Sequence, residues 1–181
     1  MEELLKLSKE YKKIVALGEI GLDYHWMNDP IEVQKLGFRK QIEKSIEYDL
    51  PIIIHTRDAL DDTIEILKEY PKARGILHCY SGNLSDVEDL LDRFYIGVGG
   101  TVTFKNNHIG HKLVESLDLK HIVLETDSPY LTPVPYRGKQ NNPVYVEFVA
   151  EKIASLKNIS VEEVKRITTE NALRVYGICL K

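Results

Sequence analysis

Four residues of metal-binding type each stand near the end of an apolar stretch of the chain. They are Glu19, His55, His78 and Asp127. The stretches that carry them, at 14–21, 51–56, 73–79 and 122–127, are rich in Ile, Val and Leu, which is typical of buried strands. A fifth such stretch, at 95–101, ends without a ligand residue. Because the carboxyl ends of parallel strands share one edge, we expect the four side chains to converge.

Each of these residues alone has a simpler structural explanation. A glutamate in an apolar strand is often ion-paired, a histidine there is often a satisfied buried one, and Asp127 could close a turn before Pro129. Four residues of ligand type at four strand ends are hard to obtain from packing alone, so their joint placement favours a site. Cys79 follows His78 directly, but neighbours in a strand point to opposite faces, so no Cys-His nucleophile pair is expected.

Two imidazoles and two carboxylates predict a site for a divalent ion that keeps positions open for water and substrate. Such an ion polarises an ester or phosphoryl oxygen and lowers the pKa of bound water to about 7. A carboxylate beside it can accept a proton from that water. The pattern therefore favours hydrolysis. The sequence has no G-x-x-x-x-G-K phosphate-binding loop of the kind found in nucleoside triphosphatases.

Helical patterns alternate with these strand-like stretches along the chain. Amphipathic helices are predicted at about 2–12, 31–48, 58–70, 85–91, 113–117, 144–156 and 161–176. The apolar stripe of the second contains Val33, Leu36, Ile42 and Ile46. Asp58, Ser85 and Ser160 are expected N-caps. Continuous apolar strands between amphipathic helices indicate a parallel sheet that is covered on both faces. We therefore expect one α/β domain over residues 1–181.

Composition excludes several classes of protein. With 24 basic and 28 acidic residues, the chain is mildly acidic, which argues against a delocalised nucleic-acid surface but not against local contacts. Two cysteines do not make a disulfide framework, and a reducing cytoplasm is expected. The charged N-terminus and the lack of a run of about 18 apolar residues predict neither secretion nor a membrane span.

Five motifs in order resemble the TatD family of metal-dependent hydrolases, mostly described as deoxyribonucleases. They are GEIGLDY (18–24), HTRDA (55–59), HCYSG (78–82), ETDSPYL (125–131) and TTENALRVYG (168–177). The resemblance implies a (β/α) TIM barrel of the amidohydrolase type with one or two divalent ions, Zn²⁺, Mn²⁺ or Mg²⁺. It also implies DNA as the substrate, cleaved from its ends or as a single strand.

The same resemblance implies a role for each site residue. Glu19 corresponds to the carboxylate that bridges two ions, and His55 and His78 to the imidazoles of one ion. Asp127 corresponds to a ligand of the other ion and to the general base. Arg57 and Arg137 are weaker candidates for contacts with phosphate, because either could be a solvated surface charge.

The chain departs from the family in one respect. Family members open with a strand ending in H-x-H, which this sequence lacks. The expected structure is therefore a C-terminal portion of the barrel, without the first three β/α units and with about five of eight strands. Three functions stay open: a deoxyribonuclease, a hydrolase of another ester such as aminoacyl-tRNA, and a non-catalytic module that binds a partner. An open barrel side predicts self-association, because edge strands and exposed apolar surface favour pairing.

Overall fold

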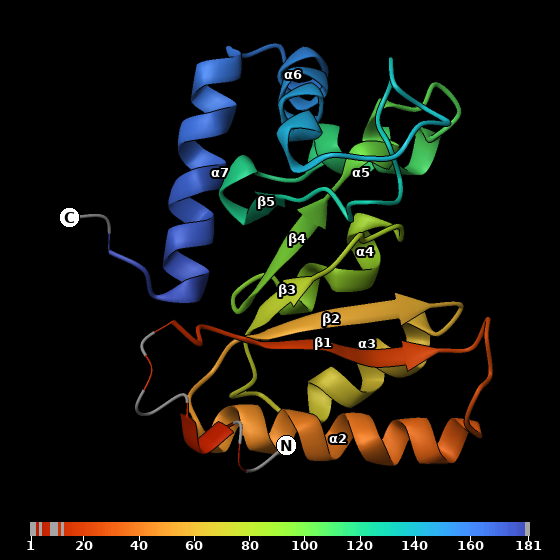
Figure 1. Cartoon of the computed structure of the whole chain (residues 1–181), viewed down its shortest axis with the longest axis vertical. Coiled ribbons are helices and arrows are strands. Elements are labelled where there is room, and N and C mark those ends of the chain that lie inside the picture. The colour runs from red at the N-terminus through yellow and green to blue at the C-terminus, as the bar shows by residue number, and fades with distance from the viewer. Residues whose placement is uncertain (1–2, 4, 8–10, 12, 180–181) are drawn as a thin grey trace.

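A sheet of five parallel strands lies at the centre of the computed structural model, which describes residues 3, 5–7, 11 and 13–179. The strands follow one another in sequence order across the sheet, as Figure 1 shows, and they are β1 (Leu17–Asp23), β2 (Ile52–Arg57), β3 (Gly75–Leu77), β4 (Phe94–Val98) and β5 (Ile122–Leu124). The parallel sheet predicted from the apolar stretches is confirmed, because every neighbouring pair of strands is parallel.

Helices connect the strands and cover the sheet. They are α2 (Ile31–Glu47), α3 (Leu60–Glu69), α4 (Leu84–Val87), α5 (His108–Ser116), α6 (Val146–Lys157) and α7 (Val161–Tyr176). Short 3₁₀ turns occupy Glu88–Leu90, Gly100–Thr103, Leu119–His121 and Pro143–Tyr145. Of the predicted helix at 2–12, residues 3 and 5–7 are helical, and most of the remainder lies outside the described residues. Among the described residues, no helix is both long and apolar enough to cross a membrane.

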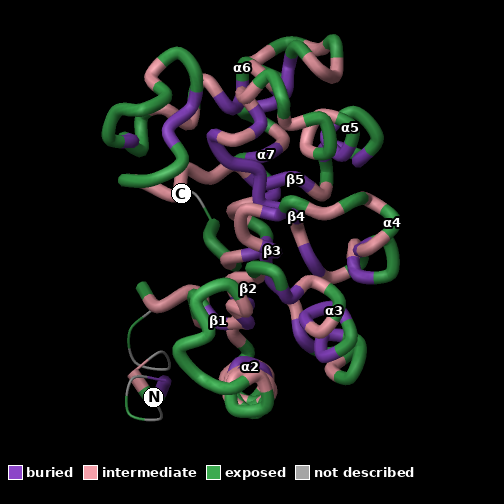
Figure 2. Tube along the Cα trace, turned by 90° about the vertical axis from the view of Figure 1, so that its right-hand side faces the viewer, coloured by how far each residue is buried: buried purple, intermediate pink, exposed green. Residues whose placement is uncertain are grey.

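The core fills the space between the sheet and its helices (Figure 2). On α2, Phe38, Ile42 and Ser45 are buried, which places the covered face of this helix at positions i, i+4 and i+7. The predicted stripe was partly wrong, because Val33 and Leu36 are each 54% exposed on the other side of the helix. The structure therefore leaves an apolar face of α2 uncovered.

Of the three predicted helix caps, the structure confirms the one at Ser160. Ser160 accepts a hydrogen bond from the Glu163 amide at 3.1 Å, so the cap of α7 is confirmed. The predicted capping box of α4 was two residues out of place, because Asn83 and Asp86 form it. Asp58 is not the N-cap of α3, which is Ala59.

Asn171 fixes α7 to the end of the sheet. Its buried side-chain amide donates hydrogen bonds to the carbonyl of Leu119 at 2.9 Å and to that of Ile122 at 2.7 Å. These carbonyls lie just before and at the first residue of β5. The helix therefore holds the strand that leads to Asp127.

Glycine sets the close contact between β1 and β2. Gly21 pairs with His55 and has a φ of +146°, a conformation that side chains rarely adopt. A Cβ at this position would lie 1.9 Å from the His55 carbonyl oxygen. Gly21 thus allows β1 to approach the backbone that carries a predicted metal ligand.

Candidate metal centre

Glu19 lies within β1 and not at its end. The strand runs on to Asp23, and the pairing of β1 with β2 shifts by one residue between Gly18 and Ile20. Glu19 is therefore the extra residue of a β-bulge, and a bulge redirects a side chain out of the regular alternation. Because of this bulge, Glu19 reaches the same site as residues at the ends of later strands.

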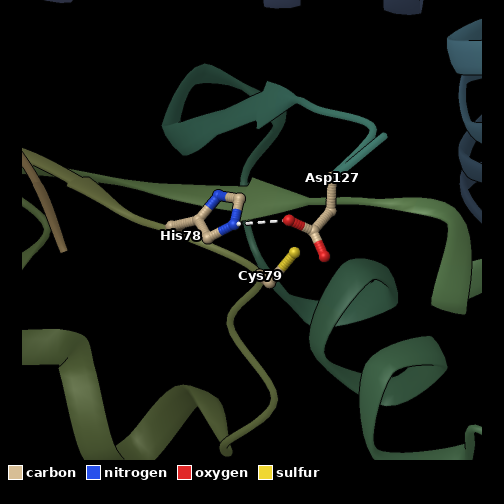
Figure 3. A group of neighbouring side chains, drawn as sticks. All are labelled: His78, Cys79 and Asp127. Atoms are coloured by element: carbon tan, nitrogen blue, oxygen red, sulfur yellow. Dashed lines mark ion pairs between the residues drawn. The ribbon is translucent and has the colours of Figure 1, made fainter. Parts of the chain in front are cut away.

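His78 contacts two of the predicted carboxylates. Its Nε2 atom lies 3.4 Å from Oδ1 of Asp127, the ion pair drawn in Figure 3. The same Nε2 atom lies 3.8 Å from Oε1 of Glu19. His55 reaches Glu19 from the other side, with Nδ1 at 3.9 Å from Oε2. The structure thus brings together all four predicted ligands, with Glu19 between the two histidines.

Glu125 holds the opposite edge of the His78 ring. Nδ1 of His78 lies 2.7 Å from Oε2 of Glu125, and the backbone amide of Cys79 donates to the other oxygen of the same carboxylate. An ionised carboxylate only accepts hydrogen bonds, so Nδ1 of His78 carries the hydrogen in this contact. The other ring nitrogen, Nε2, faces Glu19 and Asp127. A Cβ at Gly97 would lie 2.6 Å from either Glu125 oxygen, so this glycine makes room for the carboxylate.

The charges around His78 favour a cation. Burial lowers the pKa of His78, but the hydrogen bond with Glu125 and the negative charges of Glu125, Glu19 and Asp127 raise that pKa to about 9. The same negative field that holds a proton on the ring attracts a metal ion to Nε2.

Asp23 plays the corresponding part for His55. Its Oδ2 atom lies 3.1 Å from Nε2 of His55, which leaves Nδ1 to face Glu19. Burial raises the pKa of Asp23, but hydrogen bonds from the amides of Trp26 and His25 and from His55 lower it, and the net direction is downward. Each histidine of the site is thus oriented by a carboxylate, the arrangement that commonly fixes ligand histidines in metal centres.

Cys79 lies closer to the site than the sequence indicates. Atoms of His78, Cys79 and Asp127 that could bind a metal all lie within 4.8 Å of one another. The expectation that Cys79 points away from His78 was wrong, because β3 ends at Leu77 and Cys79 takes a left-handed φ of 44°. Burial and the nearby carboxylates raise the pKa of the Cys79 thiol, so the thiolate required of a nucleophile is disfavoured.

Two cavities meet at Glu19. One, of about 340 Å³, is lined by Glu19, His55, Asp23 and Trp26 among others. The second, of about 520 Å³, is lined by Glu19, His78, Glu125 and Asp127 among others. A substrate that enters either cavity therefore reaches the carboxylate that the two histidines share.

The donor set fits a divalent ion. Ligand atoms lie about 2.0–2.2 Å from Zn²⁺, so two ligands of one tetrahedral ion are separated by roughly 3.4 Å. The separations of 3.4, 3.8 and 3.9 Å between the facing atoms need only small rotations to reach that value. Mixed imidazole and carboxylate donors suit Zn²⁺ and Mn²⁺, and the carboxylates alone suit Mg²⁺.

The two arginines predicted to contact phosphate lie in different surroundings. Arg57 is the last residue of β2, and its guanidinium lies 5.6 Å from the centre of the Trp26 ring. Arg137 belongs to the long loop after Asp127, and its guanidinium lies 4.3 Å from the centre of the Phe104 ring. Their roles stay predictions, although Arg57 adjoins a residue that lines the site.

Sequence reasoning missed Glu125 and Asp23. Glu125 precedes Asp127 by two residues, but β5 ends at Leu124, so the regular alternation of a strand does not apply to this pair. Asp23 lies in the same strand as Glu19, but the bulge at Glu19 interrupts the alternation between them. The residue types were the available signal, since each is a carboxylate within four residues of a predicted ligand.

Comparisons with known proteins agree with this site. A family model described as TatD related DNase matches residues 1–177. The uncharacterized metal-dependent hydrolase YabD of Bacillus subtilis (strain 168) is 46% identical over 183 aligned positions, covering 98% of this chain and 72% of that protein. The uncharacterized metal-dependent hydrolase YcfH of Escherichia coli (strain K12) is 41% identical, covering 98% of this chain and 68% of its own length.

Solved structures share the fold. The chain resembles YJJV, a TatD homologue from Escherichia coli k12, with a TM-score of 0.89 at 29% identity, over 98% of this chain and 70% of that one. A TatD family hydrolase from Entamoeba histolytica gives a TM-score of 0.82 at 25% identity, over 97% of this chain and 67% of that one. The five parallel strands therefore have the arrangement found in TatD-type barrels.

Proposed function

The chain belongs to the TatD family of metal-dependent hydrolases, and within that family we propose that it is a deoxyribonuclease acting on the ends of single-stranded DNA. One observation carries the proposal: Nε2 of His78 faces Glu19 at 3.8 Å and Asp127 at 3.4 Å. That arrangement joins a cation-binding centre to a carboxylate able to accept a proton.

A divalent ion in this centre would polarise the phosphoryl oxygen and make water more acidic. The chain's own residues then have separate tasks. Glu19, His55 and His78 would be ligands of the ion. Glu125 and Asp23 keep the two histidine rings turned towards it. Asp127 is 31% exposed, so its carboxylate can receive the proton of the attacking water and pass it to solvent.

Arg57 supports a substrate that carries phosphate groups, which DNA does. Its cationic side chain is exposed at the end of β2, close to the residues that line the Glu19 and His55 cavity. A guanidinium binds phosphate oxygens in paired hydrogen bonds, which an uncharged carboxylic ester cannot match. We propose that Arg57 contacts a phosphate of the substrate, and Arg137 on the loop after Asp127 is a second candidate.

The deciding experiment is a hydrolysis assay on single-stranded oligodeoxynucleotides labelled at the 5′ or the 3′ end. We expect release of nucleotides with Zn²⁺, Mn²⁺ or Mg²⁺ and none with a chelator, and the label released first gives the polarity. Deacylation of aminoacyl-tRNA without release of nucleotides would instead favour a different ester. Bound metal without hydrolysis of either substrate would favour a non-catalytic module.

We also propose that the protein works in the cytoplasm. Cys79 and Cys179 are both free thiols in the structure, which suits a reducing compartment. Cell fractionation with antibodies to the protein tests this location, and enrichment in the culture medium would contradict it.

A further inference from the structure

Trp26 is an exposed aromatic side chain at the edge of the candidate metal centre. It is 64% exposed and is the single tryptophan of the sequence. It lines the cavity of about 340 Å³ that also contains Glu19 and His55. A large aromatic ring left in water beside a catalytic centre is a surface on which a flat ligand can stack.

Hydrogen bonds hold the loop that carries Trp26 in place. Oδ1 of Asp23 accepts from the backbone amides of His25 at 2.9 Å and of Trp26 at 3.0 Å. Gln34 on α2 binds the same loop, since its amide donates to the carbonyls of Asp23 and Asp29 at 3.0 Å each. The ring is therefore presented from a fixed backbone, which reduces the entropy lost when a ligand binds.

Asp23 couples this loop to the metal centre. One of its oxygens holds the backbone of Trp26, and the other lies 3.1 Å from Nε2 of His55. A single carboxylate thus sets both the orientation of a metal ligand and the position of the aromatic ring. The Trp26 backbone is held in this way near the histidine that lines the same cavity.

Cationic and aromatic neighbours surround the Trp26 ring. The Arg57 guanidinium lies 5.6 Å from its centre. The His25 ring meets it edge to face, with centroids 4.9 Å apart and planes at 85°. His25 is itself anchored, since Nδ1 lies 3.2 Å from Oδ2 of Asp58. An aromatic face with an adjacent guanidinium is the combination that binds single-stranded nucleic acid through base stacking and phosphate contact.

We propose that a base of single-stranded DNA stacks on Trp26 while Arg57 contacts the adjoining phosphate. These contacts position the strand for cleavage in the cavity that Glu19 and His55 line. The proposal rests on the nuclease function and deepens it, because it identifies the residue that positions the substrate. Stacking on a tryptophan accepts any base, so the site selects single strands and frayed ends over paired duplex, and it does not select a sequence.

Fluorescence of Trp26 tests the proposal directly, because no other tryptophan contributes to the signal. The Asp127→Asn variant, which should cleave at least about 100-fold more slowly, is titrated with an oligothymidylate, and the anisotropy of a labelled copy gives the affinity independently. We expect saturable quenching with the same midpoint as the anisotropy change. An abasic oligonucleotide of equal length should bind more weakly by about fivefold or more and should quench little, because it has no base to stack.

A substitution completes the test. In the Asp127→Asn background, Trp26→Leu should weaken binding of the oligothymidylate by about fivefold or more, and this penalty should shrink for the abasic oligonucleotide. The matched control is Tyr11→Leu, a change at another exposed aromatic residue, which comes before β1 at the amino end of that strand and should leave binding unchanged.

The outcomes separate this proposal from the nuclease function. Hydrolysis of DNA by the unsubstituted protein without quenching, or with equal penalties on both oligonucleotides, would overturn the stacking role and leave the nuclease in place. Quenching and a base-dependent penalty without hydrolysis would support the stacking role and remove the nuclease. If the protein neither binds nor hydrolyses the oligonucleotide, both the stacking role and the nuclease function are overturned.

Discussion

Oε2 of Glu125 lies 2.7 Å from Nδ1 of His78, on the edge of the ring away from Glu19 and Asp127. This contact fixes which nitrogen of His78 faces the candidate metal centre. A carboxylate in that position also makes the imidazole a stronger ligand. Glu125 is thus a positioning residue that acts through His78.

Replacing Glu125 by Gln tests that role. The amide keeps the shape but removes the charge, and we expect metal affinity to fall by about 10- to 100-fold. Isothermal titration with Zn²⁺ and with Mn²⁺ measures the affinity. Glu115→Gln, at an exposed position on α5, is the matched control and should bind metal as the unsubstituted protein does. Equal affinity in both variants would show that Glu125 does not orient a ligand.

His78→Ala tests the ligand itself. The side chain is 12% exposed and meets two carboxylates through Nε2, so its loss should remove an inner ligand and lower the metal bound per chain. Plasma emission on purified protein gives the metal content, and circular dichroism checks the fold. His108→Ala, at an exposed position, serves as the control. Unchanged metal content in a folded His78→Ala protein would rule out His78 as a ligand.

Much of this site could be predicted from residue types at the ends of apolar strands. Parallel strands deliver their carboxyl ends to one edge, so Glu19, His55, His78 and Asp127 were expected together before any geometry was known. These features depend on local periodicity, and local periodicity is visible in a sequence.

Other features of the site depend on where the backbone leaves the regular strand. The bulge at Glu19 lies in the pairing of β1 with β2, and Cys79 takes its left-handed φ just beyond the end of β3. The stripe predicted for α2 was partly wrong: Ile42 is buried as expected, but Val33 and Leu36 are exposed, and Phe38 is buried in their place. Tertiary contacts decide which of two apolar faces is buried.

Asp127 should matter for turnover more than for stability. Its carboxylate is partly exposed and faces His78 at 3.4 Å, where it can accept a proton from water. Asp127→Asn keeps the shape and removes the base, so we expect kcat to fall by about 10²- to 10⁴-fold, the contribution typical of a general base. Thermal melting should change little. A variant with near-normal turnover on the DNA substrate would refute the role.

Asn171 should matter for stability. Its amide is buried and satisfies two backbone carbonyls, those of Leu119 and Ile122. Asn171→Leu keeps the branched shape with a somewhat larger side chain but leaves both acceptors unpaired away from water, which costs about 2–4 kcal/mol. Urea denaturation measures the free energy of unfolding, with Thr169→Ala as the exposed control on the same helix. A loss of less than about 0.5 kcal/mol would mean that water replaces the amide.

Each outer strand of the sheet has one edge without a partner strand among the residues that the structure describes. In the described part of the chain, β1 pairs only with β2, and β5 pairs only with β4. Unpaired edge strands offer backbone donors and acceptors to another chain. Beside β1, the helix α2 exposes Val33 and Leu36, one turn apart on the same face, and α2 and β1 are in contact.

We therefore expect that a second copy of the 181-residue chain covers β1 and the exposed face of α2. Light scattering coupled to size exclusion should find a dimer or larger species, and Leu36→Lys should shift it towards monomer because a charge is costly in an apolar contact. Ile109→Lys is the matched control, since Ile109 is 52% exposed on α5, away from β1 in Figure 1. A stable monomer of the unsubstituted chain, with full hydrolase activity in the same fractions, would show that the edge needs no partner.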